Sequence, residues 1–126
     1  MATILVIDDD PAIRGFLEAL LGLEGYDVFT AADGISGLLA VDLHQPDCVL
    51  LDVMMPGVDG FEVLQTLRSS AQHAHLPVVM ISATSDSERS VRALSCGANR
   101  FLTKPFEMEQ LLSDLGELCA QPAVLC

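Results

Sequence analysis

Polar side chains that could take part in phosphoryl or metal chemistry follow four short apolar stretches of this 126-residue chain. Asp8 and Asp9 follow the first stretch, and Asp52 follows the second. Ser82 and Lys104 follow the other two. Carboxylates that lie close together repel one another, and a hard divalent cation such as Mg²⁺ relieves that repulsion. A lysine beside them could then hold an anionic phosphoryl group.

The elements that would position these residues alternate along the chain. Five apolar stretches read as strands: 3–7, 27–31, 48–51, 77–81 and 100–103. Apolar residues at helical spacing follow each strand. The expected helices run from Pro11 to near Gly25, from about Ile35 to Pro46, from Asp59 to Arg68, from about 87 to Gly97 and from Met108 to Leu118. This alternation predicts right-handed βαβ units and one parallel sheet.

In a parallel sheet, all strands have their carboxyl ends at the same edge. We therefore expect Asp8, Asp9, Asp52, Ser82 and Lys104 to meet there. Asp52 stands alone at its strand end, which makes it the natural acceptor of a phosphoryl group. Asp8 and Asp9 form a pair and are the natural ligands of Mg²⁺, while the lack of His or Cys beside them disfavours zinc.

The helices carry more local signals. Asp10 before Pro11 is typical of an N-cap, and Asp59 is a candidate cap of the third helix, where Arg68 is expected to face solvent. Candidate caps of the fourth helix are Thr84, Ser85, Asp86 and Ser87. Apolar residues recur at helical spacing in the first helix at Ile13, Phe16, Leu17, Leu20 and Leu21. An amphipathic second helix is predicted from Ile35, Leu38, Leu39 and Leu43.

Composition narrows the class of protein. Hydrophobic residues make up 51% of the chain, which indicates a folded single domain. Eighteen acidic residues against six Lys plus Arg give a net charge of -12, which disfavours binding to nucleic acid or an anionic membrane. We expect no signal peptide and no membrane span. The four cysteines form no Cys-x-x-Cys pair, so we expect reduced thiols and a cytoplasmic location.

Taken in order, these residues resemble the response-regulator receiver domains of two-component signalling. The resemblance runs from Ile4 to about Leu118. Its motifs are Asp8-Asp9, Asp52 with Met55-Pro56 and Asp59-Gly60, Ser82-Ala83, and Gly97-Ala98 followed by Lys104-Pro105-Phe106. It implies an α/β, flavodoxin-like fold: a doubly wound five-stranded parallel sheet of order 2-1-3-4-5 with five helices.

The resemblance also implies a role for each site residue. Asp52 would be the phosphoacceptor. Asp9 and Asp52 would ligate Mg²⁺ through their carboxylates, Met54 would do so through its backbone carbonyl, and Asp8 would hold the ion through water. Lys104 and the Ser82 hydroxyl would contact the phosphoryl group.

A conformational switch is implied as well. Ser82 would move to the phosphoryl group, and Phe101, at a position where many relatives have Tyr, would turn inward. The fourth helix, fifth strand and fifth helix would then present a changed surface to a partner or output domain. The phosphoryl donor would be a histidine kinase or phosphotransfer protein. We expect a receiver domain over residues 1–119, a tail or linker at 120–126, and a typically cis Lys104-Pro105 bond.

Two alternatives remain open from the sequence. A phosphatase of the haloacid dehalogenase type would use Asp8 as its nucleophile and Asp10 as its acid, although Ala12 stands where such proteins have Thr or Val. A receiver-like scaffold would work without phosphorylation. The identity of the phosphorylated aspartate separates the first alternative from a receiver.

Overall fold

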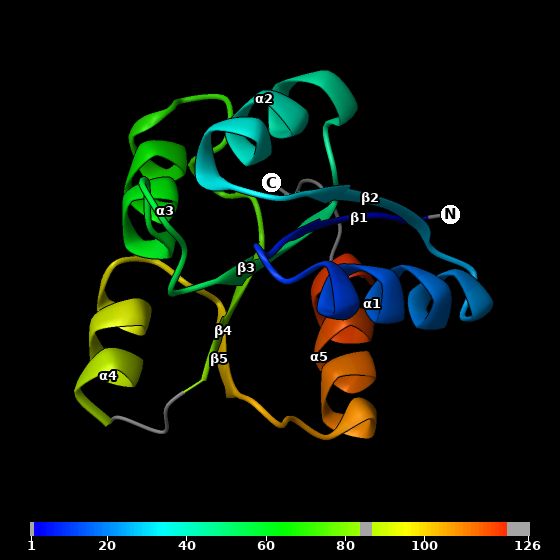
Figure 1. Ribbon diagram of the computed structural model, residues 1–126. Helices are drawn as coiled ribbons and strands as arrows, with labels where there is room; N and C mark the ends of the chain where they lie inside the picture. The colour runs from blue at the N-terminus through cyan, green and yellow to red at the C-terminus, as the bar shows by residue number, and fades with distance from the viewer. Residues whose placement is uncertain (1, 84–86, 121–126) are drawn as a thin grey trace.

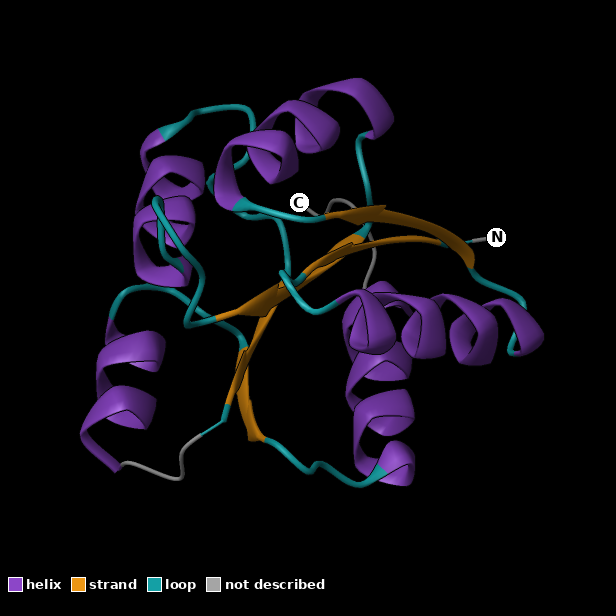
Figure 2. Cartoon of the chain, viewed as in Figure 1, coloured by secondary structure: helices purple, strands orange, loops and turns teal. Residues whose placement is uncertain are grey.

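A central parallel sheet organises the chain, and a computed structural model describes residues 2–83 and 87–120 (Figures 1 and 2). The strands are β1 (Thr3–Ile7), β2 (Asp27–Ala31), β3 (Cys48–Asp52), β4 (Val78–Ser82) and β5 (Arg100–Thr103). The helices are α1 (Pro11–Leu23), α2 (Gly34–His44), α3 (Gly60–Ser69), α4 (Ser87–Ser95) and α5 (Met108–Ala120). The sheet order is β2-β1-β3-β4-β5 with every pair parallel, as the sequence predicted.

Helices cover both faces of the sheet: α1 and α5 lie on one face, and α2, α3 and α4 lie on the other (Figure 1). Successive strand residues point to opposite faces. In β1, Leu5 packs toward α2 and α3, whereas Val6 packs toward α1 and α5. The central strand β3 is buried along its whole length, which explains its unbroken apolar sequence up to Asp52.

The predicted helix starts are confirmed where the structure describes them. The Asp10 carboxylate accepts a hydrogen bond from the backbone N–H of Ala12 at the start of α1. At α3, Asp59 and Glu62 form a reciprocal capping box. The candidate caps Thr84, Ser85 and Asp86 lie outside the described residues. Gly97 ends the α4 segment with a φ of 109°, a left-handed conformation that favours glycine.

The prediction of an amphipathic α2 was wrong. Ile35, Leu39 and Leu43 are exposed by 57%, 65% and 77%. The buried face of α2 consists of Gly34, Gly37 and Val41. Gly37 lies so close to β1 that a Cβ there would come within 2.5 Å of the Ile7 Cδ1 atom. Of the four apolar residues that predicted the helix, only Leu38 packs against the core, where it is partly buried. The other three face outward, and glycines make up most of the buried face.

Two further side chains differ from expectation. Phe16 in α1 is 53% exposed, while Leu17 and Leu21 form the buried contact of that helix. Arg68 does not face solvent: its guanidinium donates to the backbone carbonyls of Gly97 and His73. It thereby satisfies one carbonyl in the segment before β4 and one between α4 and β5, and it ties α3 to the end of α4. The helical periodicity of α3 could not reveal these contacts.

Among the described residues, none of the helices combines the length and the apolar character needed to cross a bilayer. The Lys104-Pro105 peptide bond is cis, as the sequence led us to expect.

Candidate phosphoacceptor and metal site

Three carboxylates meet at the carboxyl edge of the sheet. Asp8 and Asp9 directly follow β1, and Asp52 is the last residue of the adjacent strand β3. One carboxylate oxygen from each of the three lies within 4.8 Å of the others. Asp8 and Asp52 are buried, with 3% and 5% of their surface exposed, and Asp9 is exposed. The predicted convergence of these acids is therefore present in the structure.

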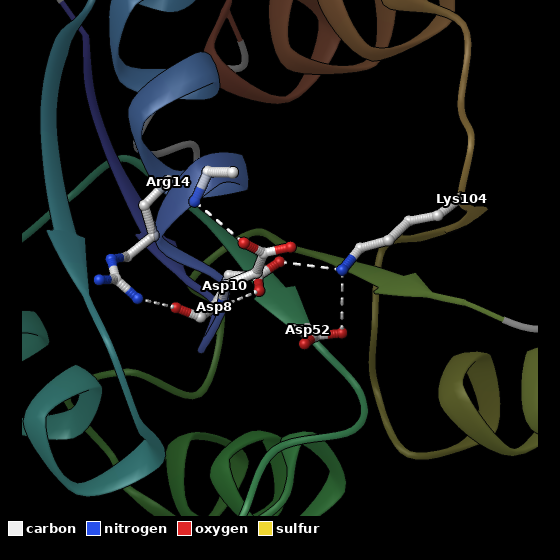
Figure 3. Close-up of polar contacts among 6 residues, drawn as sticks. Asp8, Asp10, Arg14, Asp52 and Lys104 are labelled. Atoms are coloured by element: carbon white, nitrogen blue, oxygen red, sulfur yellow. Dashed lines mark hydrogen bonds and ion pairs between the residues drawn. The ribbon is translucent and has the colours of Figure 1, made fainter.

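Lys104, which follows β5, reaches across the edge to two of the acids (Figure 3). Its Nζ atom lies 3.1 Å from Oδ2 of Asp8 and 3.6 Å from Oδ1 of Asp52. The ammonium thus faces both buried carboxylates at once. Asp52 ends β3, whereas Lys104 follows β5, and β4 lies between these two strands. The long lysine side chain spans this gap.

The start of α1 fixes Asp8 (Figure 3). The backbone N–H of Asp10 donates to Oδ1 of Asp8 at 2.9 Å, and Nη1 of Arg14 donates to the Asp8 backbone carbonyl at 2.8 Å. The sequence did not predict this use of Arg14. The available signal was its position one helical turn after the cap residue Asp10, which brings it back over the end of β1.

The Asp10 side chain serves the helix instead of the site. Its carboxylate caps α1 through the backbone N–H of Ala12, 2.9 Å away. Asp8, for its part, is paired with Lys104. The arrangement of Asp8 as nucleophile and Asp10 as acid, which a haloacid dehalogenase-type phosphatase needs, is therefore not favoured.

Burial and charge shift the pKa values at this edge. The pKa of Asp52 is raised from 3.8 to about 6, chiefly by burial and by the charge of Asp8, against the lowering effect of Lys104. For Lys104, burial lowers the pKa, but the hydrogen bond to Asp8 and the charge of Asp52 outweigh it and raise the pKa overall. The single positive charge of Lys104 therefore does not bring the pKa of Asp52 back to its usual value.

The raised pKa of Asp52 predicts that Asp52→Asn stabilises the protein when EDTA keeps divalent cations away from the site. The pKa of Asp52 is raised in the folded state, so the protonated carboxyl contributes to the free energy of unfolding. This contribution is complete below about pH 3.8 and is lost as the pH rises through about 6. One pKa unit corresponds to about 1.4 kcal/mol, and solvent screening reduces the effect. We expect urea denaturation at pH 8 to show a gain of about 1–2 kcal/mol in the free energy of unfolding.

The gain should be smaller at pH 5, where the wild-type Asp52 carboxyl is mostly protonated in the folded state. A gain of equal size at both pH values would show that the charge on Asp52 is not its cause.

The other predicted site residues lie at the same edge or beside it. Ser82 is the last residue of β4 and is fully buried, and its carbonyl accepts a 2.7 Å hydrogen bond from the backbone N–H of Lys104. Met54 follows Asp52 by two positions, and its side chain is 55% exposed. Phe101, in β5, is half-buried against the core beneath α2, α3 and α4.

The donor set fits a hard divalent cation. The three acids supply only oxygen atoms, and burial together with the charges of Asp8 and Asp9 raises the pKa of Asp52. A small number of carboxylates with one exposed member leaves room for water, as Mg²⁺ requires. The residues present are therefore suited to Mg²⁺.

A family model supplies the identification. The model described as the response regulator receiver domain matches residues 4–115. The chain belongs to this family. It is a receiver domain, the phosphorylation-activated switch module of two-component signalling.

Individual relatives agree with this assignment. The chain is 46% identical over 114 residues to the DNA-binding dual master transcriptional regulator RpaA of Synechocystis sp., covering 90% of this chain and 47% of that protein. It is 41% identical over 115 residues to the response regulator MprA of Mycobacterium avium, covering 91% and 50%. The chain thus spans about half the length of these curated relatives.

Solved structures show the same fold. The chemotaxis protein CheY4 of Vibrio cholerae matches with a TM-score of 0.87 and 34% identity, covering 94% of this chain and 98% of that one. The BeF3-activated N-terminal receiver domain of Klebsiella pneumoniae RstA matches with a TM-score of 0.87 and 28% identity, covering 94% and 99%.

Proposed function

We propose that Asp52 is the phosphoacceptor of this receiver domain and that Lys104 and Ser82 contact the phosphoryl group. The observation that carries the proposal is the position of the Lys104 ammonium, 3.6 Å from Asp52 and 3.1 Å from Asp8. It places a fixed positive charge where a phosphoryl group on Asp52 would carry negative charge.

Phosphoryl transfer to Asp52 forms one P–O bond and breaks one bond to the donor. For a phosphohistidine of a histidine kinase or phosphotransfer protein, the bond that breaks is P–N. The attacking Asp52 oxygen must be ionised, and Lys104 favours that form. After transfer, Lys104 and the Ser82 hydroxyl would hold the phosphoryl oxygens.

Mg²⁺ is part of the proposal. Asp9 and Asp52 would ligate it through their carboxylates, Met54 through its backbone carbonyl, and Asp8 through water. When bound, Mg²⁺ supplies positive charge that offsets the excess of carboxylates and the phosphoryl charge. Loss of the phosphoryl group by the domain's own slow hydrolysis would end the signal.

The test is the intact mass of the wild-type protein after incubation with acetyl phosphate. We expect one labile phosphoryl adduct in Mg²⁺ and none in EDTA. Acetate is the leaving group, so no kinase is needed. Absence of an adduct in Mg²⁺ would overturn the proposal and favour a scaffold that works without phosphorylation.

We further propose that Ser82 and Phe101 couple the site to the surface formed by α4, β5 and α5. Ser82→Ala should still accept the phosphoryl group but should lose most of the phosphorylation-dependent NMR shifts in that surface, because the hydroxyl that follows the phosphoryl group is gone. Ser82→Thr keeps the hydroxyl and is the matched control. Full shifts in Ser82→Ala would contradict the coupling.

The output is proposed from charge and from the relatives. RpaA is named a DNA-binding transcriptional regulator, and it is about twice as long as the matched region. The net charge of -12 opposes DNA binding by this domain alone. We therefore place the output in a further domain or a protein partner, and the whole system in the cytoplasm. The receiver domain in this proposal comprises residues 1–119, and 120–126 serve as a tail or linker.

A further inference from the structure

The outer side of α2 carries large apolar side chains. The buried residues of this helix all face the sheet. With about 3.6 residues per turn, Ile35, Leu39 and Leu43 fall on the opposite side and follow one another along the helix. Each of them is more than half exposed. We call these three residues the outer stripe of α2. The helix lies at the outside of the molecule, and no other described element runs across this side (Figure 1).

The composition of α2 does not suit a helix that stays half in water. Asp42 is the only Asp, Glu, Lys or Arg in the helix. A helix that is apolar all round is normally buried all round, whereas α2 buries only the side that faces the sheet. Adjoining apolar side chains on the surface of a soluble protein are typical of an interaction site. We therefore expect a further element to cover the outer stripe.

A groove continues the outer stripe at the start of α2. Its walls are residues 32–36 and, in the loop between β3 and α3, residues 56–58. Ile35 belongs to both the stripe and the groove. The two walls approach closely at Gly34, where a Cβ would lie 2.8 Å from the backbone carbonyl oxygen of Val58. The groove therefore offers a place for a side chain of a partner that extends beyond the stripe.

Acidic residues border the outer stripe. The exposed Asp33 caps α2, and its carboxylate accepts a hydrogen bond from the backbone N–H of Ser36 at 2.7 Å. Asp42 lies three positions after Leu39, so it is a neighbour of the stripe, and its side chain is 69% exposed. The elements that α2 contacts most, β1, β2 and α3, contain a single Lys or Arg. This residue, Arg68, donates to backbone carbonyls of other segments. The charge beside the stripe is therefore negative.

We infer that the outer stripe of α2 binds a basic amphipathic helix of a protein partner. The apolar side of that helix covers the stripe, and its Lys or Arg side chains pair with Asp33 and Asp42. Residues four positions apart form the ridge that helices most often use when they pack, so the partner helix crosses α2 at about 50°. This surface is separate from the one formed by α4, β5 and α5, and the inference does not rest on the proposed phosphorylation of Asp52.

The same charges disfavour two other occupants of the outer stripe. If two copies of the chain packed through α2, the acids beside one stripe would approach those beside the other. Each copy carries a net charge of -12, which adds to the repulsion. An anionic membrane surface is repelled for the same reason. A helix that combines apolar and basic side chains matches both the stripe and its border.

The test uses the full chain and two synthetic peptides. The basic peptide has about 18 residues, or five helical turns, with Leu along one side and Lys on both flanks of that side. In the acidic peptide, Glu replaces each Lys. We expect the basic peptide to bind saturably in isothermal titration calorimetry and to shift the NMR signals of α2. The binding should weaken as the NaCl concentration rises. The acidic peptide should not bind.

Three variants separate the apolar and the charged contributions. Leu39→Gln removes the centre of the stripe but keeps a good helix former, and it should weaken binding at least about tenfold. Leu23→Gln makes the same change at an exposed leucine of α1, on the other face of the sheet, and should bind like the wild type. Asp33→Asn keeps the N-cap but removes the charge, and it should weaken binding about two- to fivefold. Because all three positions are exposed, circular dichroism should show each variant folded.

The inference is overturned if the basic peptide does not bind, if it binds Leu39→Gln as tightly as the wild type, or if the acidic peptide binds equally well. Sedimentation velocity of the chain alone tests the second copy: a dimer that Leu39→Gln dissociates would replace the basic helix as occupant. Flotation with neutral phosphatidylcholine vesicles tests a lipid surface, and binding that requires Leu39 would likewise overturn the inference. Asp52→Asn should bind the basic peptide like the wild type, so a failure here is distinguishable from a failure of the phosphorylation proposal.

Discussion

Asp52→Asn is expected to abolish the labile phosphoryl adduct that acetyl phosphate forms in Mg²⁺. An asparagine amide cannot form the acyl phosphate, and the neighbouring acids cannot replace it. Asp8 is engaged by Lys104 at 3.1 Å and by the backbone N–H of Asp10 at 2.9 Å, and Asp9 is exposed. Intact mass spectrometry at several acetyl phosphate concentrations measures the effect.

Asp8→Asn is the matched control for this experiment. It changes the same type of side chain at the same edge of the sheet, but in our proposal it affects Mg²⁺ only through water. Changes of this kind typically weaken a metal site by about 10- to 100-fold, so higher Mg²⁺ should restore the adduct. An adduct that survives Asp52→Asn and vanishes in Asp8→Asn at all Mg²⁺ concentrations would contradict the proposal and revive the phosphatase alternative.

Gly60→Ala is expected to destabilise the fold by about 2–4 kcal/mol. A Cβ at this position would lie 2.4 Å from the Asp52 backbone carbonyl oxygen and 2.9 Å from the Val53 Cα atom. Both neighbours are backbone atoms, so no side chain can move aside. The 2.9 Å hydrogen bond from the Gly60 N–H to the Val53 carbonyl would be strained as well. Urea denaturation followed by circular dichroism measures the loss.

Gly15→Ala provides the control. A Cβ at Gly15, in the middle of α1, would meet no heavy atom within 4 Å. Alanine favours the helix over glycine by about 0.5–1 kcal/mol, so this variant should be more stable than the wild type. Equal stability of Gly60→Ala and wild type would mean that α3 does not begin in tight contact with the end of β3.

Close packing at Gly60 also bears on the site. The start of α3 touches the backbone of Asp52 itself, so a shift there moves the acceptor relative to Lys104. We therefore expect Gly60→Ala to slow phosphorylation even under conditions where most of it is folded.

The sequence alone determined the sheet and the composition of its functional edge. Apolar runs that end in Asp8, Asp52, Ser82 and Lys104 indicate strand ends, and the alternation with helices leaves the parallel arrangement as the natural solution. A parallel sheet then brings its strand ends to one edge without any knowledge of side-chain contacts. This is why the meeting of Asp8, Asp52 and Lys104 at one edge could be predicted from the sequence.

Only the tertiary structure decided which side chains are buried and what they touch. The apolar pattern of α2 predicted one inward face, but close approach to β1 at Gly37 admits small residues and leaves Leu39 exposed. Arg68 and Arg14 look like surface residues until the carbonyls that they satisfy are placed beside them. Periodicity describes one element at a time, whereas burial and contact depend on how closely two elements approach.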